Sequence, residues 1–235
     1  MSLDDVRAGV RPGEYIPLPQ DGRRLGSFVY EVVRERLLEG YWRAGEQIGV
    51  EQLKAELKVS KQPVMEALRR LAGDGLVEIR AQVGCRVPIY SRENVADFFT
   101  IFGGLEGASA GLAAQRCTPA QIAQLREINK VIGALDSEQD ATKRSHGYRT
   151  LNRQFHTVLL KMAYSDIVFS ISGRMWDMSD LLINTTGISQ PLADQVGDRH
   201  ADHERIIEAL RLRDTESARR EMEAHILRNI ELPSE

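Results

Sequence analysis

The 235-residue sequence is poor in cysteine and holds no long apolar run. Its two cysteines, Cys85 and Cys117, cannot build a disulfide framework, which favours a reducing compartment. No stretch approaches the roughly 18 apolar residues of a membrane span, and the first residues lack the apolar segment of a signal peptide. These absences exclude a disulfide scaffold and a membrane protein, and they predict a cytoplasmic location.

A strong excess of one charge is also missing. The chain has 31 Lys and Arg against 34 Asp and Glu, so its net charge of −3 excludes a polybasic, histone-like binder. Hydrophobic residues make up 42% of the chain, which is enough for a folded core. At roughly 100–200 residues per domain, the length allows one large domain or two modest ones.

The first 90 residues divide into a leader and a compact unit. Residues 1–22 carry three prolines and three glycines, which predict a flexible leader. Helical spacing of apolar residues predicts helices from residue 23 to Gly40, over 49–57, and from Ser60 to about Ala72. Two short apolar runs, 76–79 and 85–88, predict one β-hairpin, the only strand pair that we expect.

From Ser91 onward the pattern is helical throughout. Ser91 and Asp214 are predicted helix caps. The six predicted helices cover about 92–115, 119–135, 142–163, 165–186, 192–211 and 214–230. We therefore expect a mainly α protein, with a first unit at 23–90 and an all-α bundle at 91–235.

The start of the third helix has the chemistry of a DNA-reading element. The major groove is about 12 Å wide and admits one helix, whose first residues meet base edges. Lys61 can donate to guanine or phosphate, Gln62 can pair with adenine, and Ser60 can reach a phosphate. The hairpin tip, with Gln82 and Gly84, would lie along the minor groove as a wing. Periodicity and charge alone leave an ordinary three-helix domain with solvated charges equally open.

Residues 59–71 read Val-Ser-Lys-Gln-Pro-Val-Met-Glu-Ala-Leu-Arg-Arg-Leu. Together with the segments at 74–77 and 84–87, this run resembles the winged-helix domain of GntR-family bacterial transcription regulators. The resemblance implies a winged helix-turn-helix DNA-binding domain over residues 23–90. It leaves Arg69 and Arg70 available for the DNA backbone.

Four positions depart from that family pattern. Lys61, Gln62 and Met65 replace the Arg, Thr and second Arg of the usual V-S-R-T-P-V-R run. Glu51 stands where relatives often carry a DNA-contacting Arg. We expect the family's docking mode on a different operator, with a lower salt dependence because cationic contacts are lost.

The second half of the chain contains a candidate metal site. Asn152 and His156 are four residues apart and share a helix face, while His203 and His225 fall on two later helices. Three imidazoles from three helices can converge in a bundle and bind a divalent metal. A lone histidine is more often structural, and His200 rivals His203 by spacing. No glutamate is placed as in a zinc-protease helix, so hydrolysis has no visible base.

A second resemblance covers this half. Segment 152–156, Asn-Arg-Gln-Phe-His, resembles the D-x-x-F-H of the FCD ligand-binding domain in the FadR subfamily of GntR regulators. Segment 202–210 resembles its E-H-x-x-I-x-x-A-I, and positions within 214–225 resemble its closing D-x-x-x-A-x-x-x-M-x-x-H. Six predicted helices resemble the VanR-like branch rather than the seven-helix branch that senses acyl-CoA.

In many FCD domains an Asp and three His bind a metal, often zinc or nickel, which helps to hold a small carboxylate effector. The resemblance therefore implies His156, His203 and His225 as metal ligands. Asn152 replaces the usual Asp, so the fourth ligand is a carbonyl oxygen that brings no charge.

Effector contacts are less defined. Phe102 stands where relatives often have an arginine. Arg149 lies one turn before Asn152 and could meet a carboxylate, although a surface ion pair is the more common arrangement for such a residue. Trp176 and Asn184 are further candidates for the effector cavity, although a tryptophan is more often part of the core.

The sequence predicts a ligand-responsive repressor, not an enzyme, that binds a pseudo-palindromic operator as a homodimer. Its expected effector is a small organic acid, bound through zinc or nickel. Two alternatives stay open. One is a metal-dependent enzyme built on the histidines, although no acid or base is placed beside them. The other is a metal-free sensor in which the histidines bind the effector directly.

Overall fold

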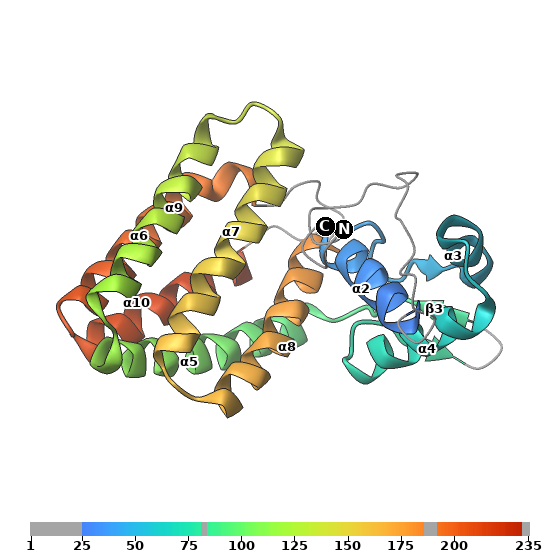
Figure 1. The fold of residues 1–235 in the computed structure, drawn as a ribbon, viewed down its shortest axis with the longest axis horizontal. Helices are drawn as coiled ribbons and strands as arrows, with labels where there is room; N and C mark the ends of the chain where they lie inside the picture. The colour runs from blue at the N-terminus through green and yellow to red at the C-terminus, as the bar shows by residue number, and fades with distance from the viewer. Residues whose placement is uncertain (1–24, 81–83, 186–191, 232–235) are drawn as a thin grey trace. The chain divides into compact units, whose positions relative to one another are not determined.

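The computed structural model describes residues 25–80, 84–185 and 192–231, so the leader and Gln82 lie outside it. The described chain is mainly helical with one small sheet (Figure 1), which confirms the expected fold class. It forms two compact units. The first holds the described residues up to Tyr90 together with the end of one later helix, from Asp180, and the second holds the other described residues.

The first unit has the predicted three helices and hairpin. Its elements are α2 (Leu25–Leu38), β1 (Gln47–Ile48), α3 (Val50–Leu57), α4 (Lys61–Gly73), β2 (Glu78–Arg80) and β3 (Gly84–Arg86). The apolar faces of α2 and α4 pack together, with Val33 and Leu68 fully buried. Gly40 follows α2 with a φ of +70°, a conformation that favours glycine and ends the helix.

The sheet corrects one expectation, because it has three strands rather than a single pair. The order is β1-β3-β2, and both pairings are antiparallel. In β1, Gln47 lies opposite Arg86 and Ile48 lies opposite Cys85. A two-residue strand is too short to show an alternating pattern, so the sequence carries no signal for it.

The second unit contains the six expected helices within the described residues. They are α5 (Arg92–Arg116), α6 (Pro119–Ala134), α7 (Ala141–Met162), α8 (Asp166–Asn184), α9 (Val196–Arg211) and α10 (Thr215–Leu227), with 3-10 turns η2 (Leu135–Ser137), η3 (Ala193–Gln195) and η4 (Arg228–Glu231). Ser91 and Asp214 cap α5 and α10, as predicted, by accepting hydrogen bonds from backbone amides. Among the described helices, none has the length and hydropathy needed to cross a membrane.

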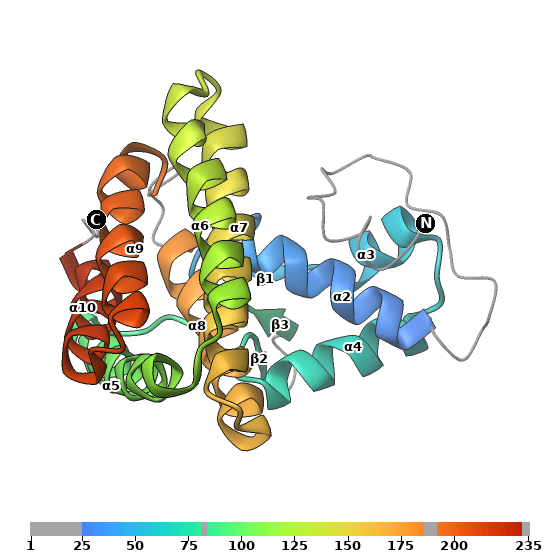
Figure 2. The same ribbon diagram turned by 60° about the vertical axis from the view of Figure 1, so that its left-hand side comes forward.

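Glycines bring α5 and α10 into close contact. Gly103, Gly107 and Gly111 follow one face of α5 at intervals of one turn, and a methyl group added to each would meet α10. At Gly107 that methyl carbon would lie 2.9 Å from the carbonyl oxygen of Arg219. On its other side, α10 packs against α9, which also packs against α6 (Figure 2). The close crossing sets the position of α10, and therefore of His225.

Candidate functional site

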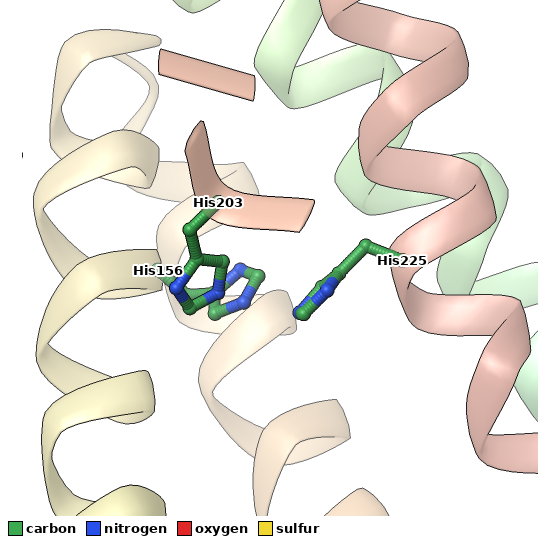
Figure 3. Close-up of side chains that lie close together, drawn as sticks. All are labelled: His156, His203 and His225. Atoms are coloured by element: carbon green, nitrogen blue, oxygen red, sulfur yellow. The ribbon is translucent and has the colours of Figure 1, made fainter. Parts of the chain in front are cut away.

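Three histidines from three helices meet inside the second unit. His156 lies on α7, His203 on α9 and His225 on α10, and Figure 3 shows their rings turned toward one another. One possible ligand atom from each lies within 4.8 Å of the others. All three side chains are buried. The structure therefore brings together the three imidazoles that the sequence singled out.

Two of the histidines are held by buried carboxylates. Nδ1 of His156 lies 3.2 Å from Oε2 of Glu106 on α5, and Nδ1 of His225 lies 3.1 Å from Oδ2 of Asp202 on α9. A carboxylate accepts hydrogen bonds, so each ring carries its proton on Nδ1. The other nitrogen, Nε2, is then left with a lone pair.

The third histidine is held by an amide whose orientation is set by its neighbours. Nδ1 of His203 lies 3.1 Å from Oδ1 of Asn129 on α6. The Nδ2 of Asn129 donates to the carbonyl oxygen of His200 and to Glu204, so its Oδ1 faces His203. His203 therefore also has its proton on Nδ1. Such outer hydrogen bonds are the usual support of histidine metal ligands.

Two of the three inner nitrogens lack partners among the described residues. Nε2 of His156 and Nε2 of His203 are buried and accept no hydrogen bond from any described residue. A buried polar atom without a partner costs about 1–3 kcal/mol. Three neutral imidazoles in one place are a common ligand set for zinc and similar divalent ions. The residues present therefore fit a divalent metal.

Burial keeps these rings neutral. It lowers the pKa of His156, although the nearby Glu106 opposes that shift, and it lowers the pKa values of His203 and His225 well below their usual range. The positive charge of Arg199 lowers all three further. At neutral pH the rings are unprotonated at Nε2, which is the state that binds metal.

Asn152 and His200 occupy different positions relative to this cluster. Asn152 lies one turn before His156 on α7, and its Oδ1 accepts a hydrogen bond of 3.2 Å from the Tyr148 hydroxyl. A carbonyl oxygen has a second lone pair, so this bond leaves it able to ligate a metal. Nδ1 of His200 instead lies 3.0 Å from the Asn129 carbonyl oxygen, outside the group of three.

Trp176, one of the effector candidates, contacts the cluster directly. Its side chain is buried, and its ring centre lies 4.2 Å from that of His156 and 5.0 Å from that of Phe102. The indole Nε1–H is a buried donor that has no hydrogen-bond acceptor among the described residues. A bound molecule with an acceptor group could satisfy it.

The other two effector candidates are Arg149 and Asn184. Arg149 is half-buried on α7, one turn before Asn152. Asn184 belongs to the first unit, where its Nδ2 donates to the carbonyl oxygens of Leu38 and Asp180. The structure therefore does not bring Asn184 to the histidines, and its amide instead fastens the end of α8 to the end of α2.

Sequence reasoning missed the residues that support the histidines. Glu106, Asn129 and Asp202 hold the three rings, and the Ser172 hydroxyl on α8 donates to Glu106 over 2.5 Å. Glu106 and Asn129 are fully buried. A signal was present, because Glu106 is an acidic residue among small and apolar ones on α5.

The expected DNA-reading residues lie around the start and outer face of α4. Ser60, Lys61, Gln62 and Arg69 are exposed, and Met65 is half-buried. The Ser60 hydroxyl caps no amide of the helix. The exposed ones among these side chains are accessible from outside the unit.

Arg70, Glu51 and Gly84 also lie in the expected DNA-binding unit. The Arg70 guanidinium lies 4.1 Å from the ring centre of Tyr30 and donates to the Ser27 hydroxyl, so α2 holds it. Glu51 is exposed and pairs with Lys54 on α3. In the wing, Gly84 is exposed with a φ of +108°, which favours glycine.

Both halves of the chain match known protein families. The family model "Bacterial regulatory proteins, gntR family" matches residues 25–87, and the FCD domain model matches residues 97–228. The Nta operon transcriptional regulator of Aminobacter aminovorans is 30% identical over 139 residues, which are 57% of this chain and 64% of that relative. The HTH-type transcriptional repressor GlaR of Escherichia coli is 22% identical over 202 residues, which cover 84% of this chain and 90% of GlaR.

The likeness to solved structures concerns the fold. The structure of E. coli McbR/YncC has a TM-score of 0.74 with this chain at 20% sequence identity. The match covers 88% of this chain and 95% of that one. The arrangement of a winged helix followed by a helical bundle is thus shared with a solved protein.

Proposed function

The chain belongs to the GntR family of bacterial regulatory proteins, and on this premise we propose that a divalent metal on its three buried histidines binds a small carboxylate effector. The protein is a DNA-binding transcription regulator with an effector-binding FCD domain, and it is not an enzyme. Relatives such as GlaR are named repressors. The proposed effector changes the affinity of this repressor for its operator.

One observation carries the metal proposal. His156, His203 and His225 each direct Nδ1 outward to an acceptor, and the described part of the chain offers no partner to the buried Nε2 atoms of His156 and His203. A zinc or nickel ion bound there would supply coordination positions for a carboxylate. Asn152, as a neutral fourth ligand, would leave the charge of the ion uncompensated by the ligand set.

Two candidate contacts would orient the effector. The unpartnered Nε1–H of Trp176 could donate to it beside His156. Arg149, half-buried on the same helix as Asn152, is the second candidate. The metal-free alternative uses the same residues, with the histidine Nε2 atoms accepting hydrogen bonds from the effector.

DNA recognition is assigned to α4 and the wing. Ser60, Lys61, Gln62, Met65 and Arg69 would meet the major groove and its phosphates. In our proposal the protein acts in the cytoplasm as a homodimer on a pseudo-palindromic operator. Its dimer contact would use α8, where Ile167 and Ile171, one turn apart, are 76% and 41% exposed.

Helix α8 is the proposed link between effector and DNA. It carries Ser172, which donates to Glu106, and Trp176, which contacts the His156 ring. It ends at Asn184, whose amide donates a hydrogen bond to the end of α2. An effector changes DNA binding only if it binds one arrangement of the protein more tightly than another. A shift of α8 on effector binding would supply two such arrangements.

The test is a gel-shift titration with DNA from upstream of the protein's own gene. Wild-type protein should retard this DNA at low salt, and Lys61→Ala should bind it more weakly. A panel of small organic acids is then added in the presence of zinc or nickel. An active acid should release wild-type protein and His146→Ala, a control on the same helix as His156, but it should not release His203→Ala.

Three results would count against parts of this proposal. A lack of any retarded band at low salt argues against the assigned DNA surface. Release that is unaffected by a metal chelator supports the metal-free sensor. Release of His203→Ala at the wild-type acid concentration removes the histidine centre from effector binding.

A further inference from the structure

A buried arginine stands beside the histidines, and the described residues supply no counter-charge for it. Arg199 on α9 is 1% exposed and is the largest fully buried side chain in the described chain. Its Nη1 donates to the carbonyl oxygen of His225, and its Nη2 donates to Oε1 of Gln195 and Oδ1 of Asn229. All of these acceptors are neutral. No described carboxylate lies within ion-pair distance of its guanidinium.

The nearest acidic groups are already engaged. Asp202 pairs with His225 and with two other arginines, Arg205 and Arg228. Glu106 pairs with His156 and accepts from a serine hydroxyl. The positive charge of Arg199 therefore reaches the histidines without being neutralised locally. A buried charge without a partner is strongly unfavourable in a protein interior.

We propose that Arg199 makes metal binding at the histidine centre depend on a bound anion, and that it selects a carboxylate as the second ligand of this centre. This inference rests on the proposed function. A divalent ion on neutral ligands, with Asn152 in place of an acid, adds positive charge next to a buried guanidinium. The two cations repel each other in a medium of low dielectric constant. An anion bound there is attracted to both.

Coupling of this kind is reciprocal: the anion raises the affinity for the metal, and the metal raises the affinity for the anion by the same factor. The metal-loaded, anion-free state is then weakly populated. The regulator would respond when metal and organic acid are both present, and a metal ion alone would not trigger the response.

The experiment titrates the purified full-length protein with Co²⁺, whose visible absorption reports ligation directly. Each titration is done in sodium acetate and in sodium perchlorate at equal ionic strength. The variants are Arg199→Met, which removes the charge, and Arg199→Lys, which keeps it. Arg211→Gln is the matched control, because it removes an exposed arginine from the same helix. Thermal unfolding shows that each variant is folded.

Acetate should raise the Co²⁺ affinity of wild-type protein by about fivefold or more, within the usual range of coupling between sites. Arg211→Gln and Arg199→Lys should keep most of this enhancement. Arg199→Met should bind Co²⁺ in perchlorate at least as tightly as wild type does, and acetate should change its affinity less than about twofold. A guanidinium that only fastens α9 to its neighbours would give variants of lower stability with unchanged acetate enhancement.

The inference is overturned in two distinguishable ways. If Co²⁺ binds wild-type protein equally in acetate and perchlorate, or if Arg199→Met keeps the wild-type enhancement, Arg199 does not couple the metal and the anion, while the metal proposal stands. If Co²⁺ binds in neither salt, the metal proposal fails as well. Equal Co²⁺ affinity of wild-type protein in acetate and in perchlorate overturns the inference even if Arg199→Met does not fold.

Discussion

Glu106 offers the sharpest test of how the centre is supported. Its carboxylate is fully buried on α5 and accepts hydrogen bonds from Nδ1 of His156 and from the Ser172 hydroxyl. In Glu106→Gln the amide oxygen can still face His156, and the serine hydroxyl can rotate to accept from the amide nitrogen. The substitution therefore removes the negative charge while leaving the hydrogen-bond geometry achievable.

The expected magnitude follows from the role of such partners. Loss of an outer carboxylate typically weakens metal binding by about 10–100-fold, or about 1.4–2.7 kcal/mol. The metal-free protein should not lose stability, because a buried carboxylate that faces a neutral ring is itself poorly compensated. Metal affinity and metal-free stability should thus change independently, or in opposite directions.

The assay is competition for zinc against a chromogenic chelator, together with urea unfolding of the metal-free protein. Glu127→Gln is the matched control, because Glu127 is exposed on α6. It should leave both quantities at the wild-type value. Wild-type zinc affinity in Glu106→Gln would refute the argument that the carboxylate supports the metal, and equal losses of stability and affinity would indicate a purely structural role.

Three further predictions concern the rest of the molecule. The buried histidines have lowered pKa values, so below about pH 6.5 the unfolded chain binds more protons than the folded chain. The free energy of unfolding of the metal-free protein should therefore decrease as the pH decreases, by at most about 4 kcal/mol per pH unit. Equal urea midpoints at pH 7.5 and 5.5 would contradict this. Gly107→Ala should destabilise the folded protein by about 1–3 kcal/mol, because the added methyl group meets the Arg219 carbonyl oxygen. Gly104→Ala, whose methyl group meets nothing within 4 Å, should stabilise it by up to about 1 kcal/mol. Thermal unfolding of the two variants tests both predictions. Glu51→Arg should steepen the plot of log affinity against log salt by about 1 on operator DNA, and an unchanged slope would place residue 51 away from the phosphates.

Helix positions followed from the sequence because their signals are local. Apolar spacing, Ser91 and Asp214 as caps, and Gly40 as a stop each depend on a few neighbouring residues. The extra strand β1 did not follow, because its two residues are defined only by backbone pairing with β3. Residue patterns carry little information about such a short pairing.

The candidate metal centre was likewise predictable from the sequence only in part. The helix-face relation of Asn152 and His156 could be read from spacing, but the convergence of His203 and His225 required the packing of α10 on α5. Sequence spacing could not show that the Asn184 amide donates a hydrogen bond to the end of α2. The burial of Arg199 is likewise a property of the packed bundle and not of its own helix.

The most direct test of the proposed centre is elemental analysis of purified, untagged protein, kept in sodium acetate so that a carboxylate is present and quantified per chain. The analysis is repeated for His203→Ala and for His146→Ala, whose histidine lies outside the cluster. We expect stoichiometric zinc or nickel in wild type and His146→Ala, and its loss in His203→Ala. Absence of metal from wild type after incubation with either ion, or unchanged metal in His203→Ala, would contradict it.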